Sequence, residues 1–172
     1  MTVSRLAAVE LARAWKGTPY VLRGRVRGAG VDCGTLLAEY LIEIGAAAQA
    51  DFEDLGIYHH DWFCHETNER YMLRLMRYAL GTVETICRPS SSAEPGCIVL
   101  FRSVGSKLYN HGCIVTQWPF AVHAVFPRVK ESNMPGHRLA AYREMKIFDP
   151  WKKPDPRMAA LLDSGSTLEV CS

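Results

Sequence analysis

Cys33 occupies a position in the sequence where a cysteine can act as a nucleophile. It follows a loop rich in glycine and arginine, and it precedes an apolar stripe with the spacing of a helix. The first N–H groups of a helix and its partial positive charge favour the thiolate, which lowers the thiol pKa. The pattern therefore predicts a reactive thiol at the start of a helix, with Gly34 leaving room beside the sulfur. The alternative is a buried cysteine in the first helical turn, because free cysteines are among the most buried residues.

Two histidines supply the base that a cysteine nucleophile needs. His111 and His123 each lie in a short apolar run of strand character, and residues 118–120 separate the two runs. Their even separation predicts a hairpin, centred at Gln117, in which the imidazoles lie directly opposite each other and on the same face. One imidazole would then act as the base while the other orients it. The alternative is two strand histidines with ordinary hydrogen bonds.

The sequence that must position these residues predicts helices first and strands afterwards. Apolar residues at helical spacing indicate a first helix over residues 3–14, a second from Cys33 to Gly45, and a third over residues 72–79. The first helix is expected to bury Val3, Leu6, Ala7, Leu11 and Ala14. Apolar runs at 97–101, 112–117 and 121–126 predict an antiparallel meander, and residues 143–148 are expected to form a last strand. Loops are expected at 20–31 and 88–96. This order is typical of an α+β fold.

The composition limits the class of protein. The chain has 172 residues, which suits one compact domain, and 20 basic against 18 acidic residues give a net charge of +2. That balance does not favour nucleic acid as a partner. No apolar run approaches the roughly 18–20 residues of a membrane span, so membrane insertion is not expected. Charges interrupt the apolar pattern of residues 1–17, so we expect no signal peptide and synthesis in a cytoplasm.

The six cysteines are scattered and form no CxxC pair, so neither a zinc cage nor a disulfide framework is expected. Residues 59–65 hold histidine, aspartate and cysteine, which are suitable zinc ligands. Their spacing matches no finger or zincin pattern, and a polar loop is the preferred interpretation. We therefore expect no metal site and no cofactor.

Five motifs, in order, resemble those of NlpC/P60 cysteine peptidases. They occupy residues 15–20, 30–34, 94–101, 110–115 and 122–124, and the resemblance covers about residues 5–148. It implies a papain-like α+β fold, with N-terminal helices packed on an antiparallel β-sheet. The implied peptidase domain spans residues 1–150, and residues 151–172 form a C-terminal tail. The segment around residues 58–62 is similar to the branch of the family encoded in phage tails and gene transfer agents.

The resemblance also implies roles for individual residues. Matched motif by motif, Cys33 is the nucleophile, His111 the base and His123 the residue that orients the base. Three further residues are implied to bind substrate, namely Tyr20, Asp32 and Gly34. Tyr20 would line the site near the sulfur, and Asp32 would help to bind an amino group of the substrate. The usual Ser-Gly after the nucleophile is replaced here by Gly34 and Thr35.

The family resemblance implies an endopeptidase that cleaves bacterial cell-wall stem peptides, commonly at the D-γ-glutamyl-diaminopimelate bond. We expect peptidoglycan as the partner, with other phage tail proteins as further partners. The protein would be made in a bacterial cytoplasm and act at the cell wall as part of a phage particle. Two alternatives stay open: a catalytically idle structural or binding protein of the tail, and a related thiol amidase or acyltransferase.

Overall fold

The computed structural model describes residues 3–52, 83–86, 92–101, 109–134 and 145–152 of the chain. Their elements are α1 (Arg5–Arg13), β1 (Arg25–Val26), β2 (Gly30–Val31), α2 (Cys33–Glu43), a 3-10 turn η1 (Gln49–Phe52), β3 (Val83–Ile86), β4 (Ile98–Phe101), β5 (His111–Gln117), β6 (Phe120–Val125), β7 (Arg128–Asn133) and β8 (Met145–Phe148). The expected third helix, the segment 59–65 and residues 153–172 of the expected tail lie outside the described residues. No helix in the described part is both long and apolar enough to cross a membrane.

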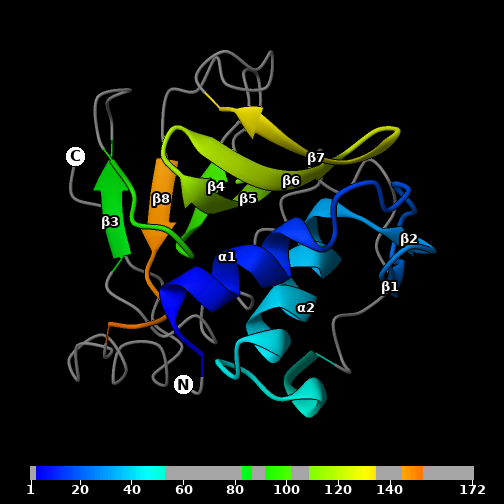
Figure 1. Ribbon diagram of the computed structural model, residues 1–172, viewed down its shortest axis with the longest axis horizontal. Helices are drawn as coiled ribbons and strands as arrows, with labels where there is room; N and C mark the ends of the chain where they lie inside the picture. Colours follow the sequence, from blue (N-terminus) through cyan, green and yellow to red (C-terminus); the bar gives the residue numbers. More distant parts are fainter. Residues whose placement is uncertain (1–2, 53–82, 87–91, 102–108, 135–144, 153–172) are drawn as a thin grey trace.

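Six strands form one antiparallel sheet in the order β3-β8-β4-β5-β6-β7. Figure 1 shows α1 and α2 together on one side of this sheet, with β3 and β7 at its two edges. Because side chains alternate along a strand, the sheet has two buried faces. Ile114 and Val122 face the helices, whereas Cys113 and Val115 belong to a second cluster with Met134. The helices packed on an antiparallel sheet confirm the predicted α+β class.

The second helix follows its sequence prediction closely. Leu36, Leu37, Tyr40 and Leu41 are fully buried in α2, and the helix ends just before Gly45, whose φ is +71°. A helix that is apolar on almost every side needs partners on every side. It finds them in α1, in β5 and β6, and in the loop before it.

The predicted buried face of the first helix is correct in part: Val3 and Leu11 pack against the core, but the other three residues do not. Leu6 is 75% exposed, and Ala7 and Ala14 are also exposed, whereas α1 buries Ala8, Val9 and Ala12. The small alanines allow the helix to approach α2 and β5 closely, and packing of this kind overrides the stripe with the largest side chains.

Several strands were not expected from the sequence. The loop predicted at residues 20–31 contains the short hairpin of β1 and β2, which Arg25 and Arg27 attach to α2 through ion pairs with Glu39 and Glu43. The charged strand β7 lies at an edge of the sheet, where polar side chains are common and a clear apolar alternation is not required. β3 occupies the other edge.

Glu131 connects β7 to the helical layer. Its carboxylate accepts hydrogen bonds from Arg13 at 3.1 Å and from Lys16 at 2.9 Å. Burial alone raises the pKa of Glu131, but hydrogen bonds from Lys16, Thr116 and Arg13 outweigh it, and the net pKa falls to about 2. The folded state therefore favours the ionised carboxylate.

We predict that Glu131→Gln lowers the free energy of unfolding by about 1–3 kcal/mol at pH 7. A folded-state pKa below the unfolded value stabilises the fold above about pH 4.5, and this contribution is lost as the pH falls toward 2. Urea unfolding of the wild type and of Glu131→Gln at pH 7, 4 and 2.5 measures the difference in their free energies of unfolding. The gap between wild type and variant should shrink with falling pH, and a gap that stays constant would contradict this account.

Candidate active site

Asp32 determines where α2 begins and thereby places Cys33 in its first turn. Its side chain accepts hydrogen bonds from the N–H groups of Gly34 and Thr35, each at 2.9 Å. The Thr35 hydroxyl accepts in return from the N–H of Asp32 at 3.0 Å, which completes a capping box. Thr35, which departs from the family pattern, thus contributes directly to the start of the helix.

Asp32 also holds the loop that precedes the helix. Its second carboxylate oxygen accepts from the N–H of Arg23 at 2.6 Å, and the residue is only 1% exposed. These partners give Asp32 a structural role that the sequence analysis missed, although an Asp followed three residues later by Thr is a recognisable capping signal. Its contact with an amino group of a substrate stays a prediction.

The environment of Cys33 gives a protonated thiol. The residue is 7% exposed, and burial raises the pKa of its thiol. The carboxylate of Asp32 raises it further, while the N–H groups of Cys33 and Gly34 lower it. The expected lowering of the pKa is therefore wrong in its net direction, because desolvation and a neighbouring negative charge outweigh the start of the helix.

His111 and His123 form a buried pair on the neighbouring strands β5 and β6. Nε2 of His111 lies 2.9 Å from Nδ1 of His123, and the two rings meet edge to face at 75°. His123 is fully buried and His111 is 7% exposed. His111 also stacks on Phe101, its direct neighbour across β4 and β5, with centroids 6.3 Å apart. The expectation that the imidazoles share one face is met by this contact.

The predicted register of the hairpin is wrong. Ile114 pairs with Val122, so the same register continued places His111 two residues beyond the position opposite His123. The strands are joined at residues 118–119, and the register shifts between Val115 and Gln117, which moves the centre of the hairpin. The histidines are therefore diagonal neighbours, a relation that long side chains can span.

His123 has a second partner on β7. Its Nε2 lies 3.1 Å from the hydroxyl oxygen of Ser132. Both ring nitrogens of this buried imidazole are thus engaged, one by His111 and one by Ser132. The sequence analysis missed Ser132 because it assigned no strand to residues 128–133. A polar residue on an edge strand gives no signal of its own in one sequence.

α2 and β5 approach each other closely at Gly112. A Cβ atom added to Gly112 would lie 2.6 Å from Cδ1 of Leu37, which is one helical turn after Cys33. Only a glycine permits this distance without displacement. The residue next to His111 therefore packs against the first turns of the helix that begins with Cys33.

Tyr20 lies in the electrostatic neighbourhood of Cys33. Its backbone N–H donates to the carbonyl of Pro127 at 2.8 Å, which attaches it to the turn between β6 and β7. Burial raises the pKa of its phenol, and the charges of Cys33 and Asp32 raise it further. The phenol therefore stays protonated at neutral pH and is able to donate a hydrogen bond. Gly34, the third predicted substrate-binding residue, is buried, and its N–H is engaged by Asp32.

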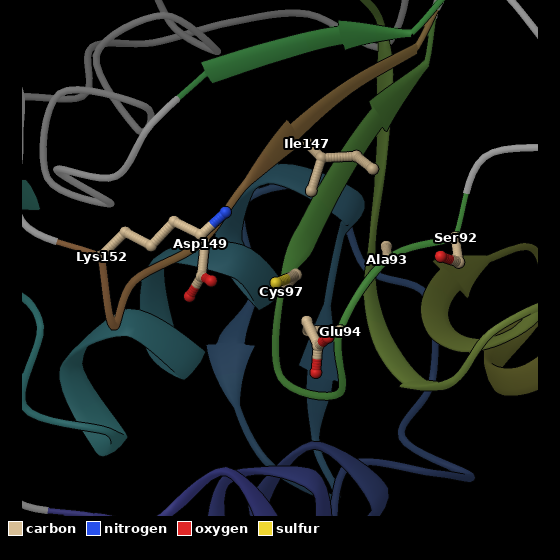
Figure 2. A pocket seen from close by; sticks show the side chains of 7 residues that line it. All are labelled: Ser92, Ala93, Glu94, Cys97, Ile147, Asp149 and Lys152. Atoms are coloured by element: carbon tan, nitrogen blue, oxygen red, sulfur yellow. The ribbon is translucent and has the colours of Figure 1, made fainter.

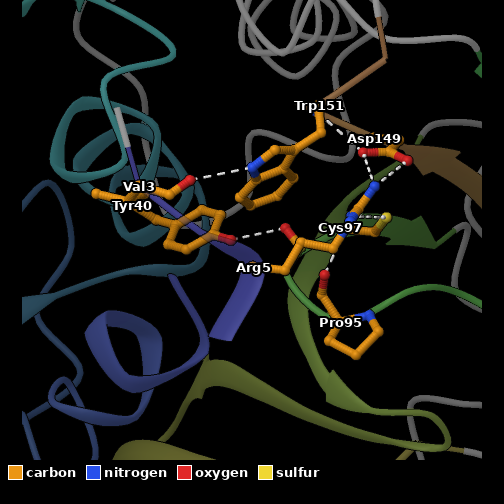
Figure 3. Close-up of polar contacts among 8 residues, drawn as sticks. Val3, Arg5, Tyr40, Pro95, Cys97, Asp149 and Trp151 are labelled. Atoms are coloured by element: carbon orange, nitrogen blue, oxygen red, sulfur yellow. Dashed lines mark hydrogen bonds and ion pairs between the residues drawn. The ribbon is translucent and has the colours of Figure 1, made fainter. Parts of the chain in front are cut away.

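A separate polar cluster surrounds Cys97, at the start of β4 (Figure 3). Arg5 binds both oxygens of Asp149, at 2.8 and 2.7 Å, and also donates to the carbonyl of Pro95 and to the sulfur of Cys97. Burial raises the pKa of the Cys97 thiol to about 11, with Asp149 adding to the rise and Arg5 opposing it. Through Arg5, the cluster connects α1 to the residues that precede β4 and follow β8.

A pocket of about 50 Å³ adjoins this cluster, and Figure 2 shows Cys97, Asp149 and Glu94 around it. Its lining contains none of the predicted site residues. Within the described part of the chain, no group of three or more metal-ligating side chains comes together.

Comparison with known proteins gives structural relatives only. No family model and no curated protein matches the chain. The NlpC/P60 domain of the peptidoglycan hydrolase SagA matches with a TM-score of 0.54 and 18% identity, over 86% of this chain and 99% of that one. NlpC1 and NlpC2 from Trichomonas vaginalis match with TM-scores of 0.57 and 0.56, each at 16% identity, over 89% and 88% of this chain. The alignments cover 47% and 50% of those two proteins. The chain thus has the fold of NlpC/P60 domains, and the papain-like architecture is confirmed.

We predict that iodoacetamide modifies Cys33 at pH 7 at least 10-fold more slowly than free cysteine. A thiol pKa raised by burial leaves little thiolate, so the rate should increase steadily as the pH rises from 7 to 10. Mass spectrometry of the peptide that contains Cys33 measures the rate, with Cys33→Ala as the control for assignment. Rapid labelling that is independent of pH above 6 would instead indicate a preformed thiolate–imidazolium pair.

Proposed function

We propose that this protein is a cysteine peptidase that hydrolyses peptide bonds in bacterial cell-wall stem peptides. The observation that carries the proposal is the buried His111–His123 pair, in a chain that has the fold of NlpC/P60 domains and whose second helix begins with Cys33. A base held by a second polar group is what a cysteine or serine nucleophile requires. The peptidoglycan hydrolase SagA, whose domain has this fold, supports the class of substrate.

In the proposed first step, His111 removes the proton of Cys33 as the sulfur attacks the scissile carbonyl carbon. Nε2 of His111 is engaged by His123, so Nδ1 is the nitrogen that takes the proton. Since the thiol is protonated at rest, proton transfer accompanies the attack instead of preceding it. The N–H of Cys33 and the phenol of Tyr20 are the donors that we assign to the oxyanion, because the N–H of Gly34 is held by Asp32.

In the second step, the carbon–nitrogen bond breaks, and His111 gives its proton to the leaving amine. The product is a thioester between the acyl group and Cys33. Water then attacks the thioester carbonyl while Nδ1 of His111 accepts a proton from it. The carbon–sulfur bond breaks, the sulfur recovers the proton from His111, and the carboxylic acid leaves.

The finer assignments rest on the sequence resemblance. We propose the D-γ-glutamyl-diaminopimelate bond as the bond cleaved, and a phage tail as the setting in which the enzyme reaches the wall. We retain residues 1–150 as the proposed peptidase domain, with residues 151–172 as its tail. Trp151 packs on the core, and its indole N–H donates to the carbonyl of Val3 at 3.2 Å, so the first residue of that tail is attached to the domain.

The proposal predicts that the wild-type protein releases new amino groups from purified peptidoglycan. Cys33→Ala should abolish the release, and His111→Ala should reduce kcat by about 1,000-fold or more. His123→Ala should cost less, about 10- to 100-fold, because an orienting group is partly replaceable. Amine release assays, with mass spectrometry of the muropeptide products, measure turnover and identify the bond.

Cys97→Ala is the matched control, since it removes a buried thiol at the other end of the same strands and should keep wild-type activity. Equal activity in the wild type and His111→Ala would refute the assignment of the base. An inactive wild type on every wall substrate would favour the idle tail protein, and release of ammonia in place of peptide amines would favour a thiol amidase.

A further inference from the structure

We propose that Arg23 is a specificity-determining residue, whose guanidinium binds a carboxylate of the stem peptide close to the bond that is cleaved. The inference deepens the proposed function and rests on it for the identity of the ligand. It starts from a backbone conformation that an arginine rarely adopts, in the loop that leads to Cys33.

Arg23 occupies a turn position that favours glycine. The N–H of Gly24 donates to the carbonyl of Val21 at 3.0 Å, so Arg23 is the third residue of a four-residue turn. Its φ is +61°, and no other non-glycine residue of the described part has a positive φ. Glycine or asparagine is usual at such a position, because a Cβ atom makes the left-handed region unfavourable. An arginine here therefore costs stability relative to a glycine.

The surroundings of the turn hold this conformation in place. The N–H of Arg23 donates to the buried carboxylate of Asp32 at 2.6 Å. A Cβ atom added to Gly24 would lie 2.6 Å from the carbonyl carbon and oxygen of Gly30, so the residue after Arg23 packs directly against β2. The backbone of Arg23 is thus fixed, and its hydrogen-bond partner is the residue that precedes Cys33.

The side chain of Arg23 does not offset the cost of its backbone. It is exposed and forms no hydrogen bond or ion pair with the protein over the ranges that the structure describes. The other two arginines of the loop differ in this respect. Arg25 binds Glu39 on α2. Arg27 binds Glu43 on the same helix. A residue that breaks a local preference, with no contact inside the protein to compensate, points to a function outside it.

A carboxylate is the group that such a guanidinium suits best. The planar guanidinium stays charged and binds a carboxylate through two parallel N–H···O bonds. In the proposed substrate, a glutamyl residue linked through its γ-carboxyl group leaves its α-carboxylate free on one side of the scissile bond. Diaminopimelate brings carboxylates on the other side. The turn that carries Arg23 is attached to Asp32, next to the proposed nucleophile, so its side chain is placed to reach one of these groups.

The test is isothermal titration calorimetry of full-length Cys33→Ala, which binds peptide without cleaving it. The first probe is γ-D-glutamyl-diaminopimelate. Three further probes carry amides in place of the glutamyl α-carboxylate, of the diaminopimelyl carboxylates, or of both. Arg23→Gly, made in the same background, should weaken binding of the first probe by about 10-fold. The loss should vanish with the probe that lacks the bound carboxylate, which identifies that carboxylate as glutamyl or diaminopimelyl.

Arg128→Ala is the matched control, because it removes the same charge from another exposed arginine. Backbone bridges place Arg128 and Val31 on either side of residues 19–20, so Arg128 belongs to a different segment beside the same loop. Its loss should leave the affinity unchanged. Arg23→Lys keeps the charge without the planar fork and should lose affinity by about 3-fold. Arg23→Gly should unfold at the same or a higher urea concentration, since glycine adopts a φ of +61° without strain.

The kinetic readout is amine release by variants that retain Cys33. Arg23→Gly should raise KM with little change in kcat, because the carboxylate is bound equally before and during the reaction. An equal loss of affinity for all four probes would overturn the inference. So would a loss in Arg128→Ala as large as that in Arg23→Gly, or a first probe that does not bind. A lower urea midpoint in Arg23→Gly would overturn its premise, since the arginine would then support the fold.

Failure of the inference and failure of the proposed function give different results. A wild type that releases amines from peptidoglycan, with no carboxylate-dependent loss in Arg23→Gly, contradicts the inference alone. A carboxylate-dependent loss in a protein whose wild type hydrolyses no wall substrate supports Arg23 as the carboxylate-binding residue and contradicts the peptidase function instead.

Discussion

The buried carboxylate of Asp32 is the interaction on which the candidate site depends. It accepts from Gly34 and Thr35 to begin α2, and from Arg23 to hold the preceding loop, so it fixes Cys33 at the first helical position. It also places a negative charge beside the sulfur, which raises the pKa of the thiol beyond the effect of burial. The group that positions the proposed nucleophile therefore also raises the pKa of its thiol. The proposed reaction therefore needs a base, because the start of the helix does not outweigh burial and the neighbouring carboxylate.

The sheet holds the two histidines of the candidate site together. His123 is fully enclosed, and its two nitrogens are held by His111 and Ser132 on the strands on either side. The diagonal offset between neighbouring strands allows His123 to contact both His111 and Ser132. Had the histidines been directly opposite, as the spacing predicts, the ring of His123 would be placed differently relative to β7.

The sequence was sufficient to predict the parts of the structure that depend on local patterns. The apolar residues of α2 and their start at Cys33 follow from helical periodicity, and the two histidine strands follow from short apolar runs. The buried face of α1 could not be predicted in the same way, because the choice of Ala8 and Ala12 over Leu6 depends on how closely α1 approaches its neighbours. The register of the hairpin depends on an irregularity beyond Val115, and β7 depends on its position at an edge of the sheet. Both properties belong to the assembled sheet.

The edge strand β7 also connects the helical layer to His123. Successive residues of β7 point to opposite sides of the sheet. Glu131 points toward α1, where Arg13 and Lys16 bind its carboxylate, and Ser132 consequently points toward His123. A slip of one residue in β7 would exchange these two side chains, leaving a carboxylate against the imidazole and a hydroxyl against two cations. The ion pairs of Glu131 therefore stabilise more than the contact between helix and sheet: they specify the register that brings Ser132 to His123.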